Sequence, residues 1–305
     1  MLKPLKRAAR AVAPEPIRHL WGTVVARTKE RSARRAFEAL APGTPARYLD
    51  AHILEDLMGR GYEAPAVIRY DPEGLVLRAV EKVEWLARSV PMERVRSCVE
   101  LGCYDGMVLA SLHHHFQGIV AFGADRSTGG IDPRARAAGV RFLQTDASQL
   151  AFDSGSLDLV YSFAAFEHFA DPGAAVDEAW RVLRPGGHLY LSFGPVYTSP
   201  FGLHAYRQIP VPYCHYLFSD AALRDYATSK GLPTAWPYVN GVTVTEYRRI
   251  FAERASRFDR LYYHEHPTGA VGAEFIIRYP SCFRARVPTF DELLVSAIEI
   301  CLRKR

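Results

Sequence analysis

The stretch Val99-Glu100-Leu101-Gly102-Cys103-Tyr104-Asp105-Gly106 decides the fold of this 305-residue chain. The apolar run over 98–101 predicts a short buried strand, and the apolar positions of 107–116 predict a helix. The glycines between them form a turn that lets a ligand approach the backbone closely, and the start of the helix offers unpaired N–H groups. The stretch therefore predicts a ligand-binding turn at the carboxyl end of a strand.

Strands and helices alternate on both sides of this turn. A helix is predicted over 75–89, short apolar runs predict strands over 118–124, 141–145, 157–163 and 188–193, and the spacing over 173–183 predicts another helix. Short strands separated by helices indicate a parallel sheet with helices on both faces. Ligands of such sheets bind beyond the carboxyl ends of the strands.

Two common nucleotide-binding loops do not match the turn. A dinucleotide site uses the pattern G-x-G-x-x-G, and Tyr104 stands at its second glycine. The phosphate loop G-x-x-x-x-G-K-[ST] is absent. The sequence therefore counts against an NAD-dependent oxidoreductase.

Acidic residues follow the next two predicted strands. Asp125 ends the second strand, where it can accept hydrogen bonds from ribose hydroxyls, and Asp146 ends the third, where it can accept from an exocyclic amine. The fourth strand runs into Ser162-Phe163-Ala164-Ala165-Phe166-Glu167-His168, and Leu183-Arg184-Pro185-Gly186-Gly187 precedes the fifth. The order and spacing of these features are more specific than any one of them.

In this order and spacing, residues 95–195 resemble the class I methyltransferases that use S-adenosylmethionine (SAM), in the type-11 branch that includes quinone-biosynthesis enzymes. The resemblance covers about one third of the chain. It implies a Rossmann-like α/β fold with a seven-stranded, mostly parallel sheet whose last strand is antiparallel. It also implies SAM as the cofactor and S-adenosylhomocysteine as the product.

The resemblance implies a role for each part of the motif. The turn, with Glu100, Gly102, Cys103, Tyr104 and Gly106, would pack against the methionine half of SAM. The ribose would be held by Asp125 with the adjacent Arg126, the adenine by Asp146 with the backbone of Ala147, and the methionine amino group by backbone carbonyls of Ser162 and Phe163. Tyr104 departs from the family pattern, because it stands where the middle glycine is usual.

The chain divides into three regions. We expect residues 1–75 to form a basic arm with helices over 17–40 and 48–58; by the resemblance, residues 76–194 would form the SAM-binding core, and residues 195–305 an acceptor lid and the rest of the sheet. The segment 195–216 is rich in proline, tyrosine and histidine, which is typical of a functional loop, and we expect it to cover the acceptor pocket. Beyond it, helices are predicted over 219–230, 247–262 and 291–302, with a late strand over 274–278.

Charge is unevenly distributed. Residues 1–35 contain ten Lys and Arg against two acidic residues (+8), and the remaining chain contains 28 against 31 (−3). A basic surface that tracks nucleic acid is therefore not expected on the core. The basic segment is predicted to be a solvated helix face, and a peripheral contact with a membrane or a partner stays open. Because the chain has no apolar run of membrane-spanning length and no secretory signal pattern, a cytoplasmic protein is predicted.

Methyl transfer to a hydroxyl group is assisted by a base, and histidine suits this task near neutral pH. His168 follows the fourth strand, and His204 and His215 lie in the predicted lid, so these three are the candidate catalytic residues. The sequence predicts a methyltransferase for a small-molecule acceptor, with O-methylation preferred and a natural product or a glycan as the acceptor class. The alternative is a catalytically silent partner subunit of the same fold.

No metal site is predicted from the sequence. His264 and His266 stand on either side of Glu265 without a third ligand at a telling distance, and His113-His114-His115 is predicted to be a solvated helix face. The five cysteines form no C-x-x-C pair and are expected to be reduced thiols.

Overall fold

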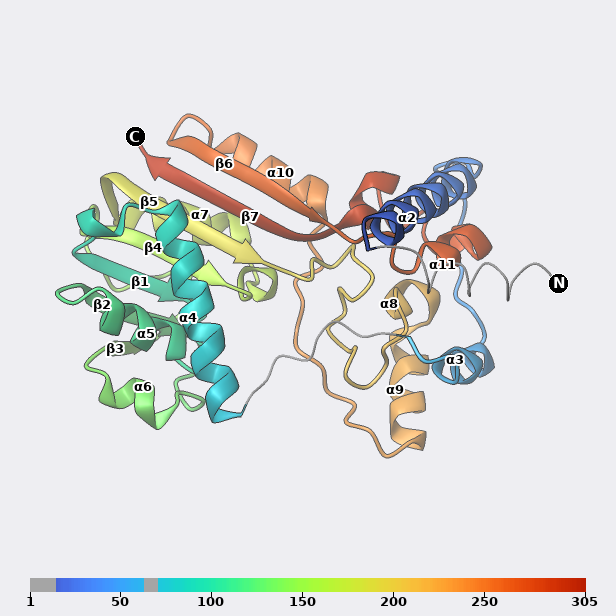
Figure 1. Cartoon of the computed structure of the whole chain (residues 1–305), viewed down its shortest axis with the longest axis horizontal. Coiled ribbons are helices and arrows are strands. Elements are labelled where there is room, and N and C mark those ends of the chain that lie inside the picture. Colours follow the sequence, from blue (N-terminus) through green and yellow to red (C-terminus); the bar gives the residue numbers. More distant parts are fainter. Residues whose placement is uncertain (1–14, 63–70) are drawn as a thin grey trace.

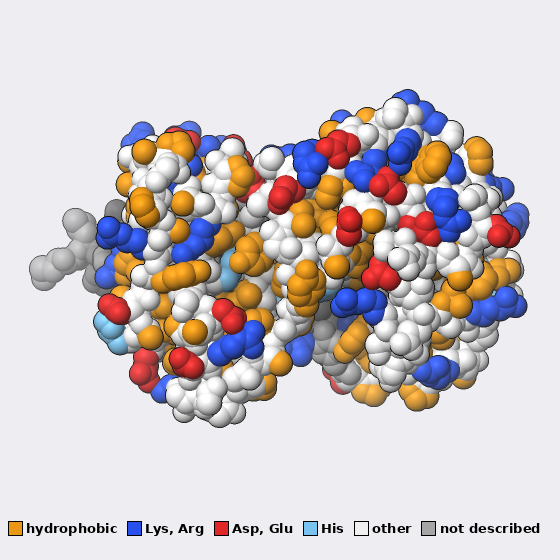
Figure 2. All heavy atoms as spheres, turned by 180° about the vertical axis from the view of Figure 1, so that it is seen from behind, with side chains coloured by type: hydrophobic (Ala, Val, Ile, Leu, Met, Phe, Trp, Pro, Cys, Tyr) orange, Lys and Arg blue, Asp and Glu red, His pale blue; other side chains and the backbone are white. Residues whose placement is uncertain are grey.

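The computed structural model describes residues 15–62 and 71–305, which form a sheet lobe and a helical lobe (Figure 1). Seen from behind, the molecule narrows between the two lobes (Figure 2). The helices of the sheet lobe are α4 (Pro72–Ser89), α5 (Met107–His115), α6 (Pro133–Ala137), α7 (Pro172–Val182) and α10 (Val244–Glu253), with the short turns η1 (Met92–Arg94) and η2 (Phe166–His168). The helical lobe contains α2 (Glu15–Glu38), α3 (Ala51–Met58), α8 (Cys214–Leu217), α9 (Asp220–Ser229) and α11 (Ala273–Arg278), with η3 (Pro280–Cys282) and η4 (Phe290–Leu294).

Seven strands form one sheet in the order β3-β2-β1-β4-β5-β7-β6. Their bounds are β1 Ser97–Leu101, β2 Val120–Asp125, β3 Arg141–Gln144, β4 Leu157–Phe163, β5 Leu183–Phe193, β6 Phe258–Pro267 and β7 Val295–Lys304. The strands β1 to β5 are parallel, and β7 pairs antiparallel with both β5 and β6. The expected Rossmann-like sheet with an antiparallel last strand is confirmed.

Helices cover both faces of the sheet because neighbouring residues of a strand point to opposite faces. On β1, Cys98 belongs to the apolar core shared with α4 and α5. The next residue, Val99, belongs to the core shared with α7 and α10. Both faces are therefore sealed, and the open edge for a ligand is the row of strand ends at Leu101, Asp125 and Phe163.

The helical lobe has an apolar core of its own. Phe37 of α2 and Leu54 of α3 pack there with Leu217 of α8 and Phe275 of α11. The helices before residue 75 and the segments after residue 195 therefore share one core, although the sequence assigns them to separate regions.

The last quarter of the chain differs from the sequence-based prediction. The helix predicted over 247–262 ends at Glu253, and the strand β6 begins at Phe258; the strand predicted over 274–278 is the helix α11. The helix predicted over 291–302 is the strand β7 after a short 3-10 turn. Its apolar positions Val295, Ile298 and Leu302 fit a helical spacing, but β7 lies between β5 and β6 and its backbone bonds to both.

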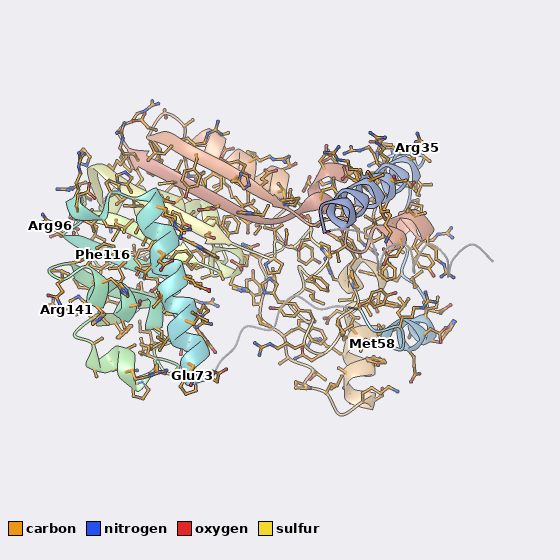
Figure 3. The ribbon with its side chains drawn as sticks, in the orientation of Figure 1. Arg35, Met58, Glu73, Arg96, Phe116 and Arg141 are labelled. Carbon is orange, nitrogen blue, oxygen red and sulfur yellow. The ribbon has the colours of Figure 1, made fainter. Side chains whose placement is uncertain are left out.

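The basic helix α2 is partly built into the helical lobe. Its residues Ala33 and Phe37 are buried, and Arg34 forms an ion pair with Asp291. Arg35 is exposed and points outward from the lobe (Figure 3). Arg27, Lys29 and Arg31 are exposed as well, as predicted for a solvated face, and Arg34 is half-buried; the part of the basic arm before residue 15 lies outside the described residues. Among the described residues, no helix is both long and apolar enough to cross a bilayer.

Candidate active site

The glycine turn after β1 is held by close backbone contacts. The Gly102 N–H donates to the carbonyl of Ala124 at 2.8 Å, which joins the turn to β2. Gly102 has φ +69°, and a Cβ placed on it would lie 2.4 Å from the Cβ of Ala165. Glycine is required here because the backbone is left-handed and because Ala165, just after β4, leaves no room for a side chain.

The side chain of Tyr104 points to solvent and does not fill the turn. Its backbone is also left-handed, with φ 46°, and its side chain is 60% exposed. The Tyr104 N–H donates to Asp125 Oδ2 at 3.0 Å, so the turn and the end of β2 are tied together. Both residues line a cavity of about 910 Å³, which lies within the usual size range of ligand sites.

The two carboxylates at the strand ends face this same cavity. Asp125 Oδ1 accepts from the Ser127 N–H at 3.1 Å, and Asp146 Oδ1 accepts from the Ser148 N–H at 2.9 Å and from its hydroxyl at 2.7 Å. The hydrogen bonds from Ser148 lower the pKa of Asp146. A carboxylate has about four acceptor positions, so both groups retain capacity for a ligand.

Most of the cofactor residues predicted from the sequence line the cavity. They are Glu100, Gly102, Cys103, Tyr104, Asp125, Arg126, Asp146, Ala147 and Phe163. Two do not. Gly106 supports the turn, because a Cβ there would lie 2.7 Å from the ring of Phe142, and the buried Ser162 hydroxyl donates to the carbonyl of Leu101 at 2.8 Å.

Two cations that the sequence analysis missed come from α4. Arg78 and Lys82 line the cavity beside Glu100. Arg78 forms an ion pair with Asp105, and the Lys82 ammonium lies 5.2 Å from the centre of the Phe163 ring. Burial lowers the pKa of Lys82 and raises that of Glu100. Their spacing of four residues on a predicted helix was the available signal, since it puts both on one helical face.

Two of the predicted histidines meet at the β4 and β5 side of the cavity. The ring centres of His168 and His204 are 4.9 Å apart. His168 Nδ1 is bonded to the carbonyl of Tyr238, and His204 Nε2 to the carbonyl of Pro195 at 2.8 Å. A carbonyl only accepts, so these nitrogens carry the hydrogens, and His168 Nε2 and His204 Nδ1 hold the lone pairs.

Burial keeps this histidine pair neutral, since it lowers the pKa of His168 and brings that of His204 to about 4. Glu167 lies beside the pair, with Oε1 3.9 Å from His168 Nε2. Burial raises the pKa of Glu167 to about 8. The sequence analysis quoted Glu167 without assigning it a role.

His215 does not reach the cavity, contrary to the sequence-based prediction. It is buried in the helical lobe, its Nε2 is 2.8 Å from the carbonyl of Tyr197, and its ring packs against Tyr216 at 4.3 Å between centres. Burial brings its pKa to about 3. The backbone of the segment 195–216 turns His204 toward the cavity and His215 away from it.

The known proteins that resemble this chain match it in the region that contains the glycine turn and the strand ends. The profile of a methyltransferase domain family matches residues 99–191. A demethylmenaquinone methyltransferase from Thermus thermophilus is 32% identical over 162 residues, which cover 50% of this chain and 74% of that enzyme. An uncharacterized methyltransferase from Mycolicibacterium gilvum is 31% identical over 173 residues, 56% of this chain and 61% of that protein.

An S-adenosylmethionine dependent methyltransferase from Mesorhizobium loti is 22% identical, with a TM-score of 0.45, and the match covers 73% of this chain and 98% of that one.

The seven-stranded α/β sheet, with one cavity at the carboxyl ends of its parallel strands, is the architecture of a ligand-binding α/β enzyme. With the family profile and the Thermus relative, the chain belongs to the class I SAM-dependent methyltransferases, and SAM is its methyl donor.

Proposed function

We propose that this enzyme transfers the methyl group of SAM to an oxygen atom of a small acceptor bound between the two lobes. The observation that carries the proposal is the pair of neutral histidines, His168 and His204, whose free ring nitrogens lie beside the cavity. Because the strand order is β3-β2-β1-β4-β5, the carboxylates that suit adenosine stand at one end of the cavity and the histidines at the other.

The lining residues fit SAM along this direction. Asp146 would accept from the adenine amine, and Asp125 from the ribose hydroxyls. Gly102 lines the cavity with no side chain, so the methionine part of SAM would lie against the backbone of the turn. Lys82, with Arg78, would bind the methionine carboxylate, since both cations line the cavity beside the turn.

SAM supplies a sulfonium group that makes its methyl carbon electrophilic. The protein must then align the acceptor oxygen with that carbon, and such positioning can contribute about 7–11 kcal/mol. His168 and His204 would hold the acceptor hydroxyl and take its proton as the new bond forms. A base in this position typically accelerates the reaction by about 10²–10⁴-fold.

The helical lobe would supply the acceptor wall. His204, Tyr206 and Arg207 line the cavity from the segment that follows β5, and this segment shares its core with the N-terminal helices. We therefore propose two functional units, a SAM-binding sheet lobe and an acceptor-binding helical lobe. The polar groups at this wall favour a hydroxylated, polar acceptor over a quinone, which is the kind of acceptor that the name of the Thermus relative implies.

The variants His168→Asn and His204→Asn test the proposal, with His215→Asn as the matched control because His215 is buried outside the cavity. SAM binding is measured by calorimetry, and S-adenosylhomocysteine release is measured with a panel of hydroxylated acceptors. We expect SAM affinity to be retained in all three variants and turnover to fall by about 10²–10⁴-fold in the first two only.

Full turnover in both cavity variants would contradict the role of the histidines. A product labelled on nitrogen or carbon, seen by NMR after transfer of a ¹³C-methyl group, would contradict O-methylation.

A further inference from the structure

Glu167, His168 and His204 form a cluster with the donors of a metal site. One ligand atom of each residue lies within 4.8 Å of the ligand atoms of the other two. Among residues 15–62 and 71–305, this is the one group of three or more such side chains. Glu167 and His168 come from the turn η2 after β4, and His204 comes from the segment after β5, so the fold assembles the cluster from two places in the chain.

Both histidines are oriented as metal ligands usually are. A ligand histidine almost always donates its second ring N–H to a carbonyl or carboxylate, which fixes the tautomer and the direction of the free lone pair. His168 makes this bond to the carbonyl of Tyr238, and His204 makes it to the carbonyl of Pro195. Each ring is therefore fixed by the backbone on one side and has its lone pair free on the other.

The carboxylate adds an independent observation. The Glu167 side chain is 1% exposed, and its Oε1 accepts from the Gly194 N–H at 3.1 Å. Its Oε2 is buried and has no hydrogen-bond partner among the described residues. Buried polar atoms are nearly always satisfied, so an unpartnered oxygen on a carboxylate that belongs to this cluster is an independent sign of a bound ligand.

We propose that Glu167, His168 and His204 bind one divalent cation of the zinc or manganese type at the acceptor end of the cavity. Two imidazoles and one carboxylate suit these ions, whereas Mg²⁺ prefers oxygen ligands alone. Three protein ligands leave at least one coordination position for an oxygen atom of the acceptor.

The use of the ion, but not its binding, rests on the proposed function. Coordination lowers the pKa of a bound hydroxyl group, so the cation would replace the histidine lone pairs as the device that activates the acceptor. The hydroxyl proton would leave to solvent, the new O–CH₃ bond would form as the S–CH₃ bond breaks, and neutral S-adenosylhomocysteine would remain.

The test begins with the full chain stripped by EDTA and dialysed. Calorimetry with ZnCl₂ and with MnCl₂ should show one equivalent bound, and MgCl₂ should bind much more weakly. Glu167→Gln and His204→Asn should each weaken Zn²⁺ binding by roughly 100-fold or more, since even outer-shell changes cost about 10–100-fold. Gln keeps an acceptor for the Gly194 N–H, and retained SAM affinity shows that each variant is folded.

Two controls separate this site from adventitious binding. The double variant His114→Ala/His115→Ala removes the exposed part of the histidine run on α5, and His264→Ala removes a histidine from β6. Both controls should keep the bound equivalent. The proposal is overturned if no cation binds, or if binding is lost in these controls and kept in Glu167→Gln.

Turnover separates the metal site from the proposed function. If the stripped enzyme binds no cation and still releases S-adenosylhomocysteine at full rate with an acceptor, the metal site is wrong and O-methylation by the histidines stands. If turnover requires Zn²⁺ or Mn²⁺ in the parent and is lost in Glu167→Gln, the cation and its use are both supported.

Discussion

Replacing Gly102 by alanine tests why the turn after β1 requires glycine. Its backbone has φ +69°, and a Cβ there would lie 2.4 Å from the Cβ of Ala165. The left-handed backbone should cost about 1–2 kcal/mol for a residue with a side chain. The overlap should cost a further 1–3 kcal/mol or so, because one of the two segments must move. We expect Gly102→Ala to lower the free energy of unfolding by about 2–5 kcal/mol and to weaken SAM binding.

Gly118→Ala is the matched control for the backbone contribution. Gly118 has φ +90°, and a Cβ there would meet nothing within 4 Å, so we expect a loss of only about 1–2 kcal/mol and unchanged SAM binding. Urea unfolding at a constant m value measures both losses. The double variant Gly102→Ala/Ala165→Gly removes the second methyl group and should recover about 1–3 kcal/mol in a double-mutant cycle.

The reasoning is refuted if Gly102→Ala and Gly118→Ala are equally destabilising, or if the cycle shows no coupling between positions 102 and 165. Either result would mean that the close approach of the chain after β4 does not select glycine at the turn.

Three further predictions follow from single side chains. Lys82→Met should weaken SAM binding by about 10–100-fold, because a hydrogen bond to a charged group contributes about 1.5–3 kcal/mol; adenosine, which lacks the methionine, should bind as before, and an equal loss for both ligands would contradict the assignment. Asp125→Asn should weaken SAM and adenosine to a similar extent in the same calorimetric assay, and loss of SAM affinity alone would argue against a ribose contact. Arg254 and Arg257 lower the pKa of Asp177, so its contribution to stability is present above about pH 4 and is lost as the pH falls further. Asp177→Asn should therefore lower Tm by roughly 1–3 °C at pH 7, and this difference should shrink as the pH falls below about 4; a difference that does not shrink would contradict the ion pair.

The parallel strands of the sheet lobe were predictable because their signals are local. The strand β4 was predicted over 157–163 and is observed as Leu157–Phe163. It is an almost continuous apolar run between turn residues, as expected for a strand buried on both faces. The strand β7 carried no such signal, because Asp291 and Glu292 suggest a helix start and the apolar residues that follow fit a helical period. Pairing with β5 and β6, which are distant in sequence, decided its structure.

The cofactor end of the site was predictable for a related reason. Parallel strands end at the same edge of a sheet, so acidic residues after β2 and β3 were expected in one cleft, and Asp125 and Asp146 do line one cavity. The histidine side of the cavity was predicted less well. His204 and His215 come from one irregular segment and carried equal weight in the sequence, yet only His204 lines the cavity.

The sequence by itself determined the order of the five parallel strands and of the helices α4, α5 and α7, the glycine turn and the carboxylates at the strand ends, but not the short helix α6. Each depends on local composition and on a periodicity that every parallel sheet shares. Only the tertiary structure decided that Lys82 comes beside Glu100, and that Glu167 and His168 meet His204. The direction of a side chain in an irregular segment depends on its backbone path, and at His204 that path has φ 60° and is held by the packing of the helical lobe.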